Sequence, residues 1–204
     1  MAQQTVKLMF VNESTDRNNS NVVFFQKNVA TSFDGYTHAW KVIRDCGRGC
    51  KHPFEYSLDF ELTAQDTEGN ILNPVQTCPG KVYKAELGPS GHIISSAVGE
   101  VSADAKDAEL KNDFPVGAIS AQAVRDGKVV ATQRCVSPGE KAVFQFQPKL
   151  YVGIMANVQE GDVMKAATIT QNNTCLNLLG VRSAVIRMTG GGDTPFNFEL
   201  TDIK

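Results

Sequence analysis

Residues 54–64 read FEYSLDFELTA, a stretch in which apolar and polar side chains alternate without interruption. Every even-numbered position is apolar and every odd-numbered position is polar. Because successive side chains of a β-strand point to opposite faces, this pattern predicts one strand with a face on a core and a face in water. Such a strand is typical of an antiparallel sheet. The next residues, QDTEGN, are rich in turn-forming types and are expected to end it.

Further short strands are predicted along the rest of the chain, separated by glycine and proline turns. The pair Asp126-Gly127 lies between two of them and predicts a type I′ hairpin, since glycine tolerates the positive φ that this turn requires. Helix is expected only at residues 103–112, as one or two turns of alanine-rich sequence after the capping residue Ser102. The predicted strands are residues 6–11, 22–27, 38–43, 82–87, 92–97, 118–124, 129–135, 142–147, 151–157, 164–170, 184–188 and 196–202.

These elements predict an all-β fold, an antiparallel two-layer β-sandwich of about a dozen strands. All-β domains often exceed about 200 residues, so a single domain over residues 1–204 is expected. Residues 66–83 and 126–144 share the order strand, turn, strand, Pro-Gly turn, strand. Common hairpin construction explains this likeness, and two meander halves, residues 1–112 and 113–204, are the alternative.

The composition excludes several classes of function. The chain has 20 basic and 22 acidic residues, closely interspersed, and no basic region that would attract nucleic acid. No apolar run approaches the length that a transmembrane helix requires. The first residues lack the features of a secretory signal, so a cytoplasmic protein is expected, with export by a non-classical route as the alternative.

The most pointed cluster of reactive side chains is CGRGCKH, residues 46–52. Cys46, Cys50 and His52 offer two thiolates and one imidazole, which are ligands that zinc prefers. The spacing differs from the usual zinc-knuckle spacings, however, and no second pair of cysteines or histidines follows. A local disulfide and a plain glycine-rich loop therefore remain as alternatives. No cofactor is expected apart from zinc at this cluster.

The five cysteines of the chain are expected to be reduced and mostly to serve as small core residues. Their number is odd, and three of them are far apart in the sequence. A secreted disulfide scaffold would carry more cysteine in fewer residues, and free cysteine is readily buried.

The aromatic residues near the only tryptophan are candidates for binding a glycan or a lipid headgroup. Trp40 is expected in the core because it buries much area, but an exposed ring would form a platform with Tyr36 and His38. Arg48, in the glycine-rich loop, and Tyr151 are the other two candidate binding residues.

The sequence carries none of the motifs of common hydrolases, zinc proteases or nucleotide-binding enzymes. The expected function is therefore a non-enzymatic binding or self-assembly protein, with a second copy of the chain as its partner. Residues 196–200, near the chain end, are the candidate strand for such pairing. A lectin-like or membrane-active sandwich that recognises a glycan or a lipid headgroup is the alternative. An enzyme that uses His38, Cys50 and His52 is the least favoured hypothesis.

Overall fold

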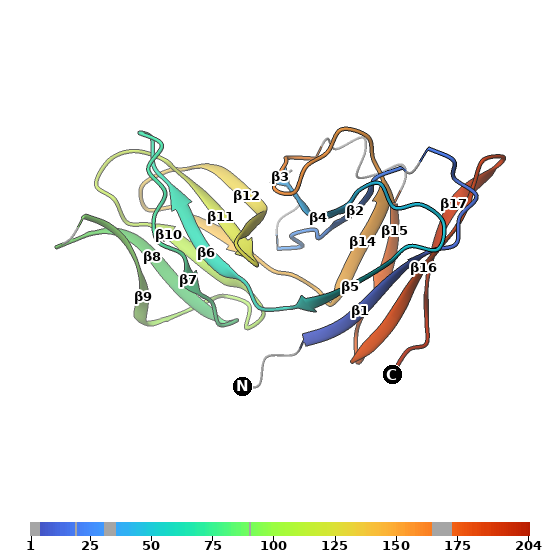
Figure 1. The fold of residues 1–204 in the computed structure, drawn as a ribbon. Coiled ribbons are helices and arrows are strands. Elements are labelled where there is room, and N and C mark those ends of the chain that lie inside the picture. The colour runs from blue at the N-terminus through green and yellow to red at the C-terminus, as the bar shows by residue number, and fades with distance from the viewer. Residues whose placement is uncertain (1–4, 19, 31–35, 90, 165–172) are drawn as a thin grey trace. The chain divides into compact units, whose positions relative to one another are not determined.

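The computed structural model describes residues 5–18, 20–30, 36–89, 91–164 and 173–204, which form seventeen β-strands and no helix (Figure 1). The all-β prediction is therefore confirmed, with more strands than the dozen expected. The strands are β1 (Thr5–Asn12), β2 (Val22–Phe25), β3 (Tyr36–Thr37), β4 (Ala39–Ile43), β5 (Lys51–Ser57), β6 (Glu61–Gln65), β7 (Val75–Gln76), β8 (Lys81–Gly88), β9 (Gly91–Val101), β10 (Ala108–Asn112), β11 (Ile119–Arg125), β12 (Lys128–Val136), β13 (Lys141–Phe144), β14 (Lys149–Ile154), β15 (Asn173–Asn177), β16 (Ser183–Gly191) and β17 (Thr194–Thr201).

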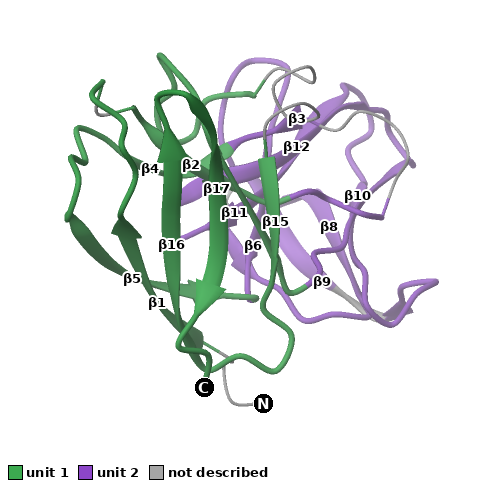
Figure 2. Ribbon diagram, turned by 90° about the vertical axis from the view of Figure 1, so that its right-hand side faces the viewer, with its two compact units in different colours: residues 1–26, 39–58, 148–204 green, residues 27–38, 59–147 purple. Residues whose placement is uncertain are grey.

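The strands belong to two compact units, which Figure 2 shows in different colours. Unit 1 comprises residues 1–26, 39–58 and 148–204, and unit 2 comprises residues 27–38 and 59–147. The chain passes from one unit to the other four times, so unit 1 is built from three separate segments and unit 2 from two. Residues 112 and 113 both lie within unit 2. That the two units form a single domain stays a prediction.

Unit 1 consists of two four-stranded sheets. The first has the strand order β17-β16-β1-β5, and the second has the order β15-β14-β2-β4. All neighbours pair antiparallel except β1 and β16, which pair parallel. A parallel pair needs a long connection, and here the chain returns to β1 only after most of its length.

Aromatic side chains from both sheets of unit 1 meet in the space between the sheets. Phe10 and Phe54 of the first sheet lie with their ring centres 6.0 and 5.1 Å from that of Phe24 in the second sheet. Trp40 on β4 lies 6.0 Å from Phe54 and 5.7 Å from Tyr56. All five rings are buried. These contacts make the unit a two-layer sandwich whose core is filled from both inner faces.

Unit 2 also contains two sheets. The first has the order β13-β10-β8-β9, in which β8 and β10 pair parallel, and the second has the antiparallel order β3-β12-β11-β6-β7. The Asn112 amide of β10 donates to the Val136 carbonyl of β12 at 2.8 Å, and the Gln133 amide of β12 donates to the Val143 carbonyl of β13 at 2.5 Å. These two hydrogen bonds tie one sheet to the other.

The prediction of one continuous strand over residues 54–64 is wrong. The stretch is divided into β5 and β6 by residues 58–60. The alternation of burial is also broken, because Leu58 is only half-buried and Thr63, expected on the face in water, is buried. Phe54 and Tyr56 are buried in unit 1, whereas Phe60 and Leu62 are buried in unit 2. A pattern of period two shows which side chains are buried, but it does not show that they are buried in the same core.

The predicted helix at residues 103–112 is also wrong. Residues 108–112 form β10, which pairs with β8 and β13, and the residues before it form a turn. Glu109 and Leu110 are both buried in this strand. Tertiary pairing on both sides has overridden a helical propensity that rested mainly on alanine.

The predicted turns agree with the structure where it describes them, and each of the other predicted strands overlaps an observed strand there. Strands β2, β13 and β14 end two or three residues earlier than predicted. Asp126 and Gly127 have φ values of 51° and 72°, which is the type I′ geometry predicted for this hairpin. The Asp66 carboxylate accepts hydrogen bonds from the backbone N–H groups of Glu68 and Asn70, which closes the turn after β6. The predicted strand at residues 164–170 lies outside the described residues except for Met164. None of the described segments forms a helix able to span a membrane.

Candidate metal site

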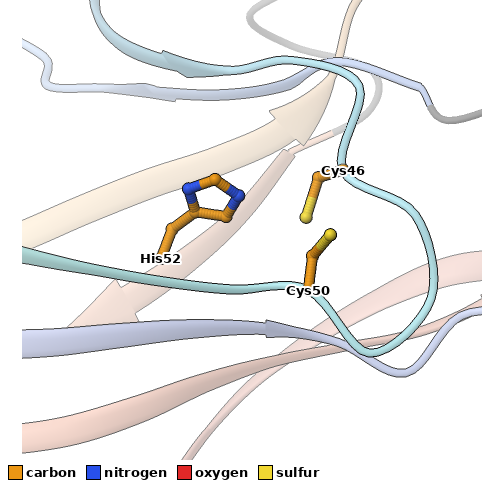
Figure 3. Close-up of side chains that lie close together, drawn as sticks. All are labelled: Cys46, Cys50 and His52. Carbon is orange, nitrogen blue, oxygen red and sulfur yellow. The ribbon is translucent and has the colours of Figure 1, made fainter.

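Cys46, Cys50 and His52 come together at the start of β5 in unit 1. One donor atom from each, the two Sγ atoms and an imidazole nitrogen, lies within 4.8 Å of the others. Figure 3 shows the two sulfur atoms pointing toward one another, with the His52 ring beside them. Cys46 is buried, and Cys50 and His52 are half-buried. The sequence cluster is therefore also a cluster in space.

The position of His52 follows from the alternation that continues through β5. His52, Phe54 and Tyr56 lie on the inner face of the sheet, and Lys51 and Pro53 lie on the outer face. In the antiparallel pair of β1 and β5, His52 stands opposite Phe10. The imidazole thus lies on the same face of the sheet as the aromatic core, beside the cysteine loop.

The loop that carries the cysteines is fixed by Asn12, the last residue of β1. Its side-chain Nδ2 donates to the Cys46 carbonyl at 2.5 Å, and its backbone N–H donates to the Cys50 carbonyl at 3.1 Å. Its own carbonyl accepts from the Gly49 N–H at 2.7 Å. Asn12 is buried, with 1% of its surface exposed. One residue therefore anchors the backbone of both cysteines.

The conformation of the loop needs a glycine at one position. Gly49 has a φ of +87°, a region that residues with a side chain rarely adopt. The Cys50 N–H donates to the Gly47 carbonyl at 3.1 Å, so the chain turns tightly between the two cysteines. This turn brings two thiols that are four positions apart to the same side of the loop.

The electrostatics of the cluster disfavour two bare thiolates. Burial, followed by a hydrogen bond with Cys50 and the charge of the Cys50 thiolate, raises the pKa of Cys46 to about 12. The Cys46 thiol therefore stays protonated at neutral pH unless a positive charge is added. A divalent metal supplies that charge and lowers the pKa of the thiols that it binds.

The spacing of the donor atoms suits a tetrahedral zinc ion. Bonds of about 2.3 Å to sulfur and about 2.0 Å to nitrogen separate the donors of such a site by about 3.5–3.8 Å. Donors that already lie within 4.8 Å need to approach by about 1 Å, which side-chain rotation supplies. Two thiolates and one imidazole are the soft ligand set that selects zinc over magnesium or calcium.

The other cysteines differ from what the sequence predicted. All five cysteines are free, but Cys78, Cys135 and Cys175 are exposed and only Cys46 is buried. The prediction that most of them are core residues is therefore wrong. Cys78 lies in the connection between β7 and β8, Cys135 lies in β12 where its pairing with β11 is irregular, and Cys175 lies in the edge strand β15. Nothing in the sequence pattern marks these three as different.

The structure places the five predicted binding residues in different surroundings. Trp40 is 3% exposed and belongs to the core of unit 1. His38 is buried in unit 2, where its Nε2 lies 2.8 Å from the Thr132 Oγ1. Tyr36, also in unit 2, is partly exposed and has the guanidinium of Arg134 over its ring at 4.2 Å.

The two remaining binding candidates lie in unit 1. Arg48 is exposed in the loop between Cys46 and Cys50. Tyr151 stacks on Phe25 with ring centres 5.4 Å apart, and burial, followed by the neighbouring Cys175, raises the pKa of its hydroxyl. A glycan or lipid site built from these residues stays a prediction.

Sequence reasoning missed Asn12. It lies 34 positions before Cys46, and the sequence offers only its place in a polar segment after a strand. The side chain of a buried asparagine needs hydrogen-bond partners, but the sequence alone does not show which backbone groups the fold brings to it.

Fold and site together define an all-β sandwich protein that carries a cluster of two cysteines and one histidine suited to a metal ion. The chain belongs to the RhiA family, whose model matches residues 3–193. No curated protein and no solved structure matches the chain.

Proposed function

We propose that this protein is a non-enzymatic binding protein whose ligand is a zinc ion held by Cys46, Cys50 and His52. The observation that carries the proposal is the convergence of three soft donor atoms within 4.8 Å on a loop anchored by a buried residue. A binding site whose ligands are already close together loses little conformational freedom when the ion enters.

Among the described residues the cluster has three ligands, which leaves one position of a tetrahedral zinc for a fourth. A closed structural site normally has four protein ligands, whereas three ligands and a solvent molecule are typical of an accessible site. Cys50 and His52 are half-buried, so solvent can reach this position. The site therefore suits reversible uptake of metal better than permanent structural binding.

Metal binding to the reduced protein tests the proposal. Apo protein, purified with a reductant that does not bind metal, should take up one zinc ion per chain, measured by elemental analysis after gel filtration. Cobalt(II) should give the intense near-ultraviolet bands of thiolate ligation together with visible bands of tetrahedral geometry. Zinc at about a hundredfold excess over its Kd should raise the free energy of unfolding by about 2.7 kcal/mol.

Variants at the site and away from it separate specific from adventitious binding. Cys50→Ser and His52→Asn should each lose most of the metal, whereas Cys175→Ser, an exposed cysteine of the same unit, should retain it. The proposal fails if the wild-type protein takes up no zinc, or if Cys50→Ser binds as much as the wild type. A Cys46–Cys50 disulfide in protein purified without added oxidant would favour the alternative interpretation of the loop.

Self-assembly through residues 196–200 stays a prediction. These residues lie in β17, the edge strand of the first sheet of unit 1, and among the described residues β17 pairs only with β16. An open edge permits pairing with another chain but does not select one.

A further inference from the structure

A second candidate site lies in unit 2, in a pocket of about 230 Å³ that is separate from the cysteine cluster. Three parts of the chain form its walls: the turn after β6, the hairpin of β8 and β9, and the segment between β10 and β11. The lining residues are Asp66, Thr67, Glu68, Leu87, His92, Phe114, Pro115, Val116, Gly117 and Ala118.

The wall at residues 114–118 is fixed by Asn112, which is buried. Its Nδ2 donates to the Gly117 carbonyl at 2.9 Å and to the Val136 carbonyl at 2.8 Å. Its Oδ1 accepts from the Phe114 N–H at 3.1 Å. Two of these hydrogen bonds hold the wall, at Phe114 and at Gly117, and the third ties Asn112 to β12, so the pocket is largely formed before any ligand arrives.

His92 is held on two sides within the pocket. Its Nδ1 lies 3.1 Å from the Asp66 Oδ2, and its ring lies against Phe114 with ring centres 4.5 Å apart. Asp66 is oriented by the Asn70 side chain and by two backbone N–H groups, and the Asn70 hydrogen bonds lower the pKa of its carboxyl. Because Nδ1 faces this carboxylate, Nε2 is the ring nitrogen that Asp66 does not engage.

Two large aliphatic side chains at the pocket are unusually exposed. Leu87 is 64% and Val116 is 79% exposed. Exposed aliphatic side chains beside a hollow that carries a few polar groups are typical of ligand sites, because the ligand covers them.

The charges of the pocket select the sign of the ligand. Asp66 and Glu68 are the acidic residues among those that line it, His92 pairs with Asp66, and none of the lining residues is a lysine or an arginine. An anion would therefore be repelled, whereas a cation would gain from both carboxylates and could donate a hydrogen bond to an acceptor.

We infer that this pocket binds a small organic amine with an apolar body about the size of one ring. The ammonium group lies near the Glu68 carboxylate, and the apolar body covers Leu87 and Val116. The volume agrees with this size, since an apolar cavity of about 150 Å³ accommodates benzene and 230 Å³ leaves room for a short chain.

Titration of the full-length, isotope-labelled protein with 2-phenylethylamine tests the inference by nuclear magnetic resonance. Amide signals of His92, Val116 and Gly117 should shift and saturate at millimolar amine. Phenylacetate, which has the same ring and the opposite charge, should leave them unchanged. The inference fails if no signal of the pocket shifts, if the shifts map elsewhere, or if phenylacetate binds equally well.

Exposed residues allow variants that leave the fold intact. Val116→Ser should weaken amine binding by about threefold to tenfold, because it removes apolar contact area. Glu68→Gln should weaken it by about twofold to fivefold, the usual effect of an exposed charge. Val101→Ser and Glu199→Gln, exposed positions outside the pocket, serve as matched controls and should leave the affinity unchanged. Equal affinity of Val116→Ser and the wild type would overturn the placement of the ligand.

Discussion

A single buried amide at residue 12 connects the N-terminal strand to the candidate metal site. Asn12 supplies two hydrogen bonds through its side chain, one to the Cys46 carbonyl and one from the Ser14 N–H at 2.9 Å. Replacing it leaves a buried carbonyl and a buried N–H without these partners, and each such loss costs about 1–3 kcal/mol. Asn12 is thus a positioning residue, which acts on the metal through the loop and does not contact the metal itself.

Asn12→Ala should lower both stability and metal affinity. The free energy of unfolding should fall by about 2–3 kcal/mol in urea titrations, because buried hydrogen bonds are lost. Cobalt(II) affinity should fall by about tenfold or more, since the cysteine loop is no longer held in place. Asn18→Ala, an exposed asparagine in the segment that follows, is the control and should change neither quantity. Unchanged cobalt affinity in Asn12→Ala would show that the loop holds the cysteines in place without Asn12.

The strand β10 shows how tertiary partners decide an element. Its Glu109 carboxylate forms an ion pair with the Lys141 Nζ at 2.8 Å and accepts hydrogen bonds from Ser102 Oγ and the Ala103 N–H. Burial alone would raise the pKa of Glu109, but Lys141 and the two hydrogen bonds outweigh burial and hold this pKa below its usual value of 4.5. The carboxylate is therefore ionised in the folded protein at all but acidic pH.

The lowered pKa of Glu109 predicts the direction of a pH effect. An unfolded Glu109 binds a proton more readily than the folded one, so its contribution to stability is present above pH 4.5 and is lost as the pH falls through the folded pKa. At neutral pH, the free energy of unfolding of Glu109→Gln should be about 1–3 kcal/mol lower than that of the wild type. Urea titrations should show this difference shrinking below pH 4.5. A difference that is constant from pH 7 to pH 3 would contradict the assignment.

Strands with a clear alternating pattern were predictable from the sequence. Very short strands, and strands that form only because of their pairing partners, were not. The apolar positions of β1, β5 and β6 follow the pattern, as does the Asp126-Gly127 hairpin. Strands β3 and β7 have two residues each, too few for any period to show. The strand β10 has an alanine-rich approach and a buried glutamate, and only its partners β8 and β13 make it a strand.

The candidate metal site was predictable because its three ligands lie within seven positions of one another. The pocket around His92 was not, since its walls come from segments separated by up to 52 positions, from Asp66 to Ala118. Local spacing can reveal a site on one loop. A site assembled from several loops depends on strand order and register, which are set by long-range pairing.

At the scale of the whole molecule, the connections between the two units determine whether the units unfold together. The chain crosses between them with both flanks anchored. Gln26 is buried in unit 1, where its amide donates to the Lys149 carbonyl at 3.3 Å, and two positions later Asn28 bonds within unit 2 to the Val143 carbonyl at 2.8 Å. Similarly, Thr37 pairs with Ala131 in unit 2 and Ala39 pairs with Phe25 in unit 1. If one unit unfolded, the chain segments that run into the other unit would therefore lose their anchor at one end, which would destabilise the other unit as well.

This connectivity predicts a single unfolding transition, which two spectroscopic signals can test. Trp40, the only tryptophan, is buried in unit 1, so its fluorescence reports unit 1 alone, whereas far-ultraviolet circular dichroism reports the strands of both units. The urea midpoints of the two signals should coincide. Ile119→Val, in the core of unit 2, should lower both midpoints together, with a loss of about 1 kcal/mol, and Ile186→Val in unit 1 should do the same. If Ile119→Val shifts the dichroism curve and leaves the Trp40 curve in place, the units unfold independently and the chain has two domains.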